Sequence, residues 1–277
     1  MSKYRTCAGM STFNTGNSVC PLDPGKVKAI ILMTSGQKLP TDLTADVLEE
    51  LCHADRPNRI YPLKTIVEYA PSGGEAQTSA VGYGPTKITG YSPKTDTWTL
   101  ESADLSIKAN LAKARNAAFD AYFVDDNNVI YGIQSNDGSL SGVPMAGVYP
   151  GGQDFTSSGQ NATLTVTTMF KDYEKFMKDM NVMVCDFDVV EALHGVVFVD
   201  FVKDGDGYKI LEHYGKLDIT EYYGEAIATN KEVITNASTV TYSGGKLSIT
   251  MDDSDTEPEL AAPSVLQAAG MVGIEQW

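Results

Sequence analysis

The densest group of potentially reactive side chains lies between residues 52 and 59. Cys52 is followed directly by His53, and Asp55 comes two residues later. A histidine beside a carboxylate could act as an acid–base pair, and a neighbouring cysteine could be its nucleophile. Catalytic partners, however, usually meet in space rather than along the chain. We therefore favour a helix C-terminus, where histidine and arginine side chains interact with the last carbonyl groups and the helix dipole.

Two short acidic segments suggest calcium ligands: Asp125-Asp126-Asn127-Asn128 and Asp204-Gly205-Asp206-Gly207. An EF-hand loop needs oxygen ligands at its first, third, fifth and twelfth positions, with glycine at the sixth. Counted from Asp204, the fifth, sixth and twelfth residues are Tyr208, Lys209 and Gly215, so the pattern fails. The other segment continues directly into apolar residues and fails as well. Both are better interpreted as hairpin turns.

Asp186 and Asp188 are separated by one residue and would project from the same side of a strand. Two carboxylates on one face could form a glycosidase pair, but such pairs are common on solvated sheet faces, and we favour that explanation. We therefore expect no catalytic, cofactor-binding or metal-binding residues, and we expect that the protein is not an enzyme.

The four cysteines have long, irregular spacings without the CxxC or paired-histidine pattern of a zinc site. Cys52 and Cys185 lie in apolar segments, which predicts that they are buried as small apolar side chains. Disulfides are rare in proteins folded in a cytoplasm. A disulfide between Cys7 and Cys20, formed after release from the cell, remains an alternative.

The elements that must hold these residues are mostly short strands. Alternating or short apolar runs predict strands and hairpins over residues 27–33, 63–70, 94–102, 121–133, 161–169, 182–190, 196–211, 238–242 and 246–251. Helical spacing predicts short helices over residues 45–52, 104–118 and 171–180. This mixture indicates an α+β fold: mostly antiparallel β-sandwich or β-barrel modules with a few short flanking helices.

One pattern occurs twice. Residues 123–131 and residues 201–210 each read as strand, polar turn and strand, each after a predicted helix that itself follows a threonine-rich strand. The repetition predicts two related modules, and a duplicated module favours ring-building or scaffold proteins. Residues 27–52 add a strand and a helix to the first half, so the duplication is not strict.

The sequence pattern also predicts that the chain has four parts. Residues 1–27 are rich in Ser, Thr, Asn, Gly and Pro and predict an extended N-terminal arm. Residues 27–150 form a first β-rich module and residues 151–251 a second, because the segment around Pro144, Pro150 and Gly151 reads as a loop. Residues 252–277 form an acidic linker and a mildly apolar tail, which either docks on a partner or forms a final helix.

The bulk composition excludes several classes of function. The chain has 277 residues, a formal charge of −15 and no cluster of Lys and Arg. This composition argues against binding to nucleic acid. The charge keeps the protein soluble or lets DNA pass without adhering. No run approaches the ~18–20 apolar residues that a membrane-spanning helix needs. The first residues lack the apolar core of a secretory signal, so we expect synthesis in a cytoplasm.

The segment Thr95–Leu100, the helix predicted after it, and the hairpin from Tyr122 to Gly132 together resemble phage tail tube proteins, and more broadly virion structural proteins of phages. The resemblance implies a β-sandwich flanked by a helix, which assembles into stacked rings around a DNA channel. Three chains with two modules each would make a ring of six. It also implies no catalytic residues, and contacts between rings through long hairpins and the N-terminal arm.

We therefore expect a virion structural protein that self-assembles as a tail tube subunit, without cofactors. A capsid decoration or head–tail connector protein is one alternative, and a carbohydrate- or cell-surface-binding module is another. The expected partners are further copies of the chain, other virion proteins and passing DNA in transient, non-specific contact, with no membrane. The expected location is the virion, after assembly in the host cytoplasm.

Overall fold

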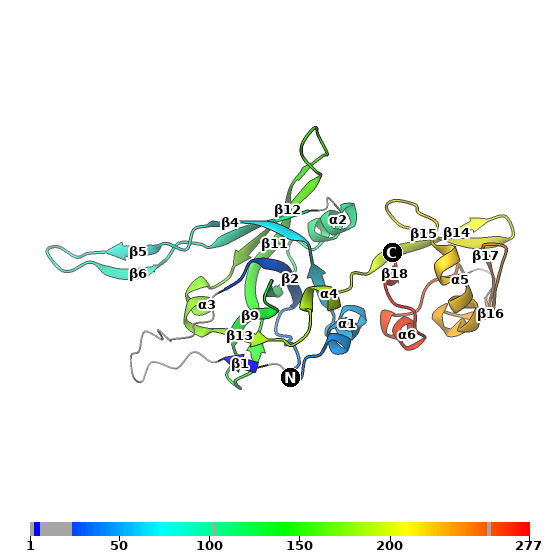
Figure 1. Ribbon diagram of the computed structural model, residues 1–277, viewed down its shortest axis with the longest axis horizontal. Helices are drawn as coiled ribbons and strands as arrows, with labels where there is room; N and C mark the ends of the chain where they lie inside the picture. Colours follow the sequence, from blue (N-terminus) through cyan, green and yellow to red (C-terminus); the bar gives the residue numbers. More distant parts are fainter. Residues whose placement is uncertain (1–2, 6–23, 102–103, 254–255) are drawn as a thin grey trace. The chain divides into compact units, whose positions relative to one another are not determined.

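The computed structural model describes residues 3–5, 24–101, 104–253 and 256–277 (Figure 1). Most of the predicted N-terminal arm, and with it Cys7 and Cys20, lies outside the described residues. The chain forms two compact units. The first consists of Met1–Leu48 with Ile60–Leu193, and the second of Glu49–Arg59 with His194–Trp277.

The first unit contains one continuous 11-stranded antiparallel sheet, which divides into two sheets at one long strand. The first sheet is formed by β1 (Lys3–Arg5), β13 (Met180–Val184), β9 (Val129–Gln134), β8 (Phe119–Asp125), β2 (Val27–Thr34) and β3 (Ile60–Leu63), with β10 (Leu140–Ser141) beside β9. The second sheet is formed by β11 (Val143–Asp154), β12 (Thr163–Phe170), β7 (Thr95–Leu100) and β4 (Ile66–Ser72). One edge of β8 pairs with β2, and the other pairs with β9 and with the start of β11. β11 therefore carries the chain from the first sheet into the second.

The apolar core of the first unit draws on strands of both sheets. Every residue from Ala29 to Met33 in β2 is buried, as expected for a strand that is covered on both faces. Ile30, Trp98 and Val166, from β2, β7 and β12, belong to one continuous cluster. The predicted α+β class, mostly antiparallel strands with a few short helices, is confirmed.

Short helices flank these sheets, and aspartates begin three of them. Asp104, Asp172 and Asp188 accept hydrogen bonds from backbone N–H groups in the first turns of the helices that follow. These helices are α2 (Leu105–Lys113), α3 (Tyr173–Asp179) and α4 (Val189–Ala192). α2 is shorter than the predicted helix over residues 104–118, because the chain turns after Lys113 and enters β8 at Phe119. Leu111 of α2 is buried in the core.

A long hairpin projects from the second sheet (Figure 1). β4 and β7 continue into a separate two-stranded ribbon, β5 (Ala76–Ser79) and β6 (Lys87–Tyr91). The break between them lies at Gly73 and Gly74, which both have positive φ angles. A Cβ atom on Gly73 would lie 1.9 Å from the Pro93 carbonyl oxygen, so glycine is required there. We call residues Ala76–Tyr91 the arm, and residues 81–85 its tip.

The second unit is a five-stranded sheet with helices packed on its apolar face. The strand order is β16 (Ala237–Ser243), β17 (Lys246–Met251), β15 (Gly207–Glu212), β14 (Val197–Asp204) and β18 (Ile274–Gln276), with β18 parallel to β14. The helical elements are the end of α1 (Ala45–His53), α5 (Thr220–Thr229), α6 (Pro263–Ala268) and the 3-10 turn Lys231–Val233. Leu266, Met271 and Ile274 complete the core, so the tail predicted over residues 252–277 contains a helix and supplies core residues to this unit.

The division between the units differs from the predicted one at residues 150 and 151. That position lies inside β11, which pairs with β12 on both sides of it. Gly151 and Gly152 lie in the register shift between Pro150 and Gln153, whereas Pro144 and Pro150 stand opposite Asp120 and Val166 in the ladders. Such a bulge leaves residues unpaired, so the two glycines are tolerated there without ending the strand.

Both predicted hairpins exist, but they do not belong to two equivalent modules. β8 pairs with β9 in the first unit, and β14 pairs with β15 in the second. The elements that precede the second hairpin complete the first unit: β12 pairs with β7, and β13 pairs with β9. The two similar sequence segments therefore pair with different strands and are not equivalent modules. Among the described residues, no helix is long and apolar enough to cross a membrane.

Candidate functional site

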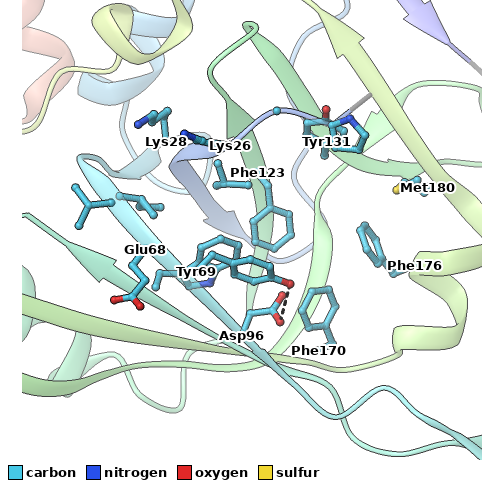
Figure 2. A pocket seen from close by; sticks show the side chains of 16 residues that line it. Lys26, Lys28, Glu68, Tyr69, Asp96, Phe123, Tyr131, Phe170, Phe176 and Met180 are labelled. Carbon is cyan, nitrogen blue, oxygen red and sulfur yellow. Dashed lines mark hydrogen bonds between the residues drawn. The ribbon is translucent and has the colours of Figure 1, made fainter. Parts of the chain in front are cut away.

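The first unit contains an apolar pocket of about 490 Å³ (Figure 2). It lies where β4 and β7, the strands at the base of the arm, meet β8, β9, β12 and α3. Six aromatic side chains line it: Tyr69, Trp98, Phe123, Tyr131, Phe170 and Phe176. Its volume is within the range of about 300–1,000 Å³ that is usual for sites that bind small molecules or side chains.

Strand register places these rings side by side. Tyr69 on β4 is paired with Trp98 on β7, and their rings stack with centroids 4.6 Å apart. Trp98 lies 5.4 Å from Phe123 of β8, which in turn stacks on Phe170 at 6.1 Å. The indole N–H of Trp98 donates to the Thr168 hydroxyl at 3.0 Å, which fixes the ring orientation. Stacked rings of this kind form a rigid apolar wall.

One buried carboxylate lies in this wall. Asp96 accepts a hydrogen bond from the Tyr69 hydroxyl at 3.2 Å, and its Oδ1 lies 2.8 Å from the Lys94 ammonium. Burial raises the pKa of Asp96, while the bond to Lys94 and the charge of that ammonium act against the rise. Burial also raises the pKa of the Tyr69 hydroxyl, and the Asp96 charge adds to that effect.

The mouth of the pocket is mixed in character. Lys26 precedes β2, Lys28 lies in β2, and Glu68 lies in β4 (Figure 2). Val67 of β4 also lines the pocket. The side chain of Val67 is 56% exposed. The buried polar groups are already paired with one another, and the remaining surface is apolar. The pocket is therefore suited to binding an apolar or aromatic group rather than to acid–base chemistry.

The structure places the sequence-predicted reactive cluster elsewhere, in the second unit. His53 is buried, with Nδ1 2.9 Å from the Glu49 carbonyl oxygen and Nε2 accepting from the Gly273 N–H at 3.0 Å. Backbone groups thus occupy both ring nitrogens. Cys52 is buried, and the exposed Asp55 accepts a hydrogen bond from Ser264. These contacts agree with the helix C-terminus that we favoured over an acid–base pair.

The two acidic turns also have structural roles. Asp125 is completely buried and accepts hydrogen bonds from three backbone N–H groups and from the Tyr131 hydroxyl. Asp204 lies near the ammonium groups of Lys209 and Lys246, at 3.5 and 3.2 Å. Among the residues that the structure describes, no three His, Cys, Asp or Glu side chains form a group that could hold a metal ion.

The expected carboxylate pair on one strand is a wrong prediction. β13 ends at Val184, before Asp186, and Asp188 instead begins α4 by accepting from the Glu191 N–H at 2.9 Å. An aspartate after an apolar run reads equally well as a strand residue or as a helix cap, and here the cap prevails. Cys185 is buried, as predicted, and burial raises the pKa of its thiol to about 11.

The aromatic pocket could not be found from sequence patterns. Its six aromatic lining residues come from five strands and a helix that are distant in the chain. The alternation that puts Trp98 and Leu100 on one face of a strand was visible, but it indicated only a buried face. Pairing of β7 with β4 brings Tyr69 beside Trp98, and packing of β8 in the core brings Phe123 to it.

No protein-family model matches the chain, and no curated protein sequence matches it. Two solved structures are similar in part. The cap that terminates the tube of the anti-feeding prophage is 8% identical, with a TM-score of 0.27 over 62% of this chain and 98% of that chain. A chain of the anti-feeding prophage baseplate is 11% identical, with a TM-score of 0.25 over 61% of this chain and 100% of that chain. TM-scores of this size carry no argument about fold or role.

Proposed function

We propose that this protein is a structural component of a phage-type virion, and that it acts by self-assembly as a tail tube subunit, in stacked rings around a DNA channel. The arm is the observation that carries the proposal. It projects from the sheet with every residue from Glu75 to Thr89 exposed, including Val81, Tyr83 and Ile88. Large apolar side chains that are exposed to water on a projecting ribbon do not stabilise a monomer.

The chemistry of the arm supports an assembly. A two-stranded ribbon is at best marginally stable in water and is stabilised when another surface covers it. Its edges also present unpaired backbone groups that a neighbouring chain can satisfy. The formal charge of −15 fits a channel lining, because acidic side chains repel the phosphates of passing DNA. The resemblance of the hairpin over Tyr122–Gly132 to tube proteins points the same way.

Negative-stain microscopy and sedimentation of the purified protein over a range of concentrations test this function. We expect rings or tubes, whose formation depends on the arm. A variant with Val81→Ser and Tyr83→Ser should remain monomeric at concentrations at which the unmodified protein assembles. The control is Phe155→Ser, which removes an 80% exposed aromatic side chain from a different hairpin. A protein that stays monomeric at every concentration would overturn the proposal.

A further inference from the structure

We propose that the aromatic pocket of each chain receives the arm tip, residues 81–85, of a second copy. This inference rests on the proposed self-assembly and names the contact through which it occurs. The first unit has a concave apolar surface at the base of its long hairpin and a convex apolar surface at the end of the same hairpin. Each is incomplete without a partner, and the two have matching chemistry.

The tip cannot fill the pocket of its own chain. Tyr69 lies in the pocket wall, and Val81 follows twelve residues later along a ribbon that runs away from the sheets of the first unit (Figure 1). At about 3.3 Å for each extended residue, this separation is about 40 Å. The occupant must therefore come from another molecule. A contact between different surfaces of identical chains is head-to-tail, and it either closes a ring or propagates as a filament.

The tip matches the pocket in side-chain chemistry. Val81 is 89% exposed and Tyr83 is fully exposed. A tyrosine can stack against the rings that line the pocket, of which Trp98 and Phe170 are two. Its hydroxyl can donate to Asp96, because both known contacts of that carboxylate use Oδ1 and a carboxylate has about four acceptor sites.

The charges are also compatible. The protein carries 36 acidic and 21 basic residues, so two copies repel each other over most of their surfaces. The arm, Ala76–Tyr91, contains no acidic residue and one basic residue, Lys87. It can therefore approach a second copy without like-charge repulsion. The exposed Glu68 at the mouth of the pocket has the sign opposite to that of Lys87.

Photocrosslinking in the full-length protein tests the contact. A benzophenone amino acid replaces Tyr83, the assembled protein is irradiated, and the crosslinked peptides are identified by mass spectrometry. We expect intermolecular links to the pocket residues 66–69, 96–98 and 170–180. The matched control carries the same photoreactive group at Phe155, which is also exposed at the end of a hairpin, and it should give no link to those residues.

A variant of the pocket mouth supplies the second measurement. Val67→Arg places a long charged side chain across the opening at an exposed position, so the fold should tolerate it. We expect self-association to weaken about tenfold or more, as for the loss of a central contact in an interface. Val202→Arg, on an exposed position of β14 in the second unit, is the control and should assemble normally.

The outcomes separate this inference from the proposed function. Rings or tubes with Tyr83 links inside the pocket support both. Rings or tubes whose Tyr83 links lie outside the pocket, or that form normally with Val67→Arg, overturn the inference and leave the proposed function standing. A protein that remains monomeric, with no intermolecular link, overturns both.

Discussion

Lys94 and Asp96 form an ion pair in the interior of the first unit, with 2.8 Å between Nζ and Oδ1 and side chains only 8% and 5% exposed. The pair lies beside the aromatic pocket, and the Lys94 ammonium is 5.9 Å from the centre of the Tyr173 ring. A buried charge is expensive unless its partner is present. The two residues therefore act as one unit in the stability of the pocket wall.

Removal of one partner should be costly. Lys94→Met leaves the Asp96 carboxylate without its cation, and we expect a loss of about 3–5 kcal/mol in the free energy of unfolding. The double variant Lys94→Met with Asp96→Leu should recover most of that loss, because no buried charge remains. Fluorine NMR of fluorotryptophan-labelled protein in urea measures the free energy of unfolding. Each unit is followed separately, because Trp98 lies in the first unit and Trp277 in the second.

An exposed ion pair is the control for this cycle. Lys178 and Glu174 lie 2.5 Å apart on the surface of α3, with side chains 67% and 45% exposed. Lys178→Met should leave unfolding unchanged within error, because solvent screens exposed pairs. A double variant as unstable as Lys94→Met would contradict the prediction.

Gly73 should determine how the arm is held. Alanine at this position combines a positive φ of 74° with a Cβ atom 1.9 Å from the Pro93 carbonyl oxygen, and the backbone must shift to accept it. We expect Gly73→Ala to cost about 1–3 kcal/mol locally. Amide hydrogen exchange should accelerate in β5 and β6, and self-association should weaken because the tip is displaced.

Gly90→Ala is the matched control for this substitution. Gly90 lies in the same ribbon, but its φ is not in the left-handed region and an added Cβ would meet no atom within 4 Å. Exchange rates in this variant should equal those of the unmodified protein. Equal rates in both variants would show that the backbone at Gly73 is not constrained as described.

The parts of the fold that were predictable are those fixed by local chemistry. The turn at Asp125 could be recognised because an aspartate that accepts neighbouring N–H groups stabilises a tight turn within a few residues. The end of α1 at His53 followed from the same kind of reasoning. In each case the interactions that determine the structure are mostly between residues close in sequence.

The division of the chain could not be predicted, since it depends on pairing between distant strands. Pro150 and Gly151 look like a boundary in the sequence, and only the bulges in β11 make a continuous strand possible there. The pocket was missed for the same reason: Tyr69 and Phe170 are brought together through β7 and β12. Hydrophobic periodicity identifies which face of a strand is buried, but not which strand covers it.

Asp125 should be essential to the first hairpin. Its Oδ1 accepts from the N–H groups of Asn127 and Val129, and its Oδ2 from Gly25 N–H and the Tyr131 hydroxyl. Asp125→Asn turns one acceptor into a donor that faces other donors, with an expected cost of about 3 kcal/mol. Urea unfolding followed at Trp98 measures it. Asp126→Asn, which affects one exposed backbone bond, should cost much less.

The same turn provides a test of calcium binding. Because the oxygens of Asp125 are occupied by protein donors, added Ca²⁺ or EDTA should leave the thermal midpoint unchanged. A rise in the midpoint with Ca²⁺ that disappears in Asp125→Asn would contradict this structural role and restore the calcium interpretation.

Asp218 should make the stability of the second unit depend on pH. Its Oδ1 accepts from the backbone N–H and the hydroxyl of Thr220 at the start of α5, and its Oδ2 lies 3.0 Å from the Lys209 ammonium. The hydrogen bond from the Thr220 hydroxyl, followed by that from Lys209, lowers the pKa of Asp218 from 3.8 to about 2. The Thr220 hydroxyl oxygen in turn accepts from the Ile210 N–H, so the Asp218–Thr220 hydrogen bonds connect the start of α5 to β15.

The sign of the effect follows from proton binding. Between pH 4 and pH 2 the unfolded chain binds a proton at Asp218 more readily than the folded chain does, so this contribution to stability is complete above about pH 4 and is lost as the pH falls toward 2. Asp218→Asn should therefore destabilise the second unit near neutral pH, by about 0.5–1 kcal/mol after allowance for solvent screening. The difference from the unmodified protein should shrink to nothing near pH 2. Urea unfolding followed at Trp277 measures this difference, and Asp206→Asn, in an exposed turn, is the control. A difference that persists at pH 2 would show that Asp218 does not act through its ionised carboxylate.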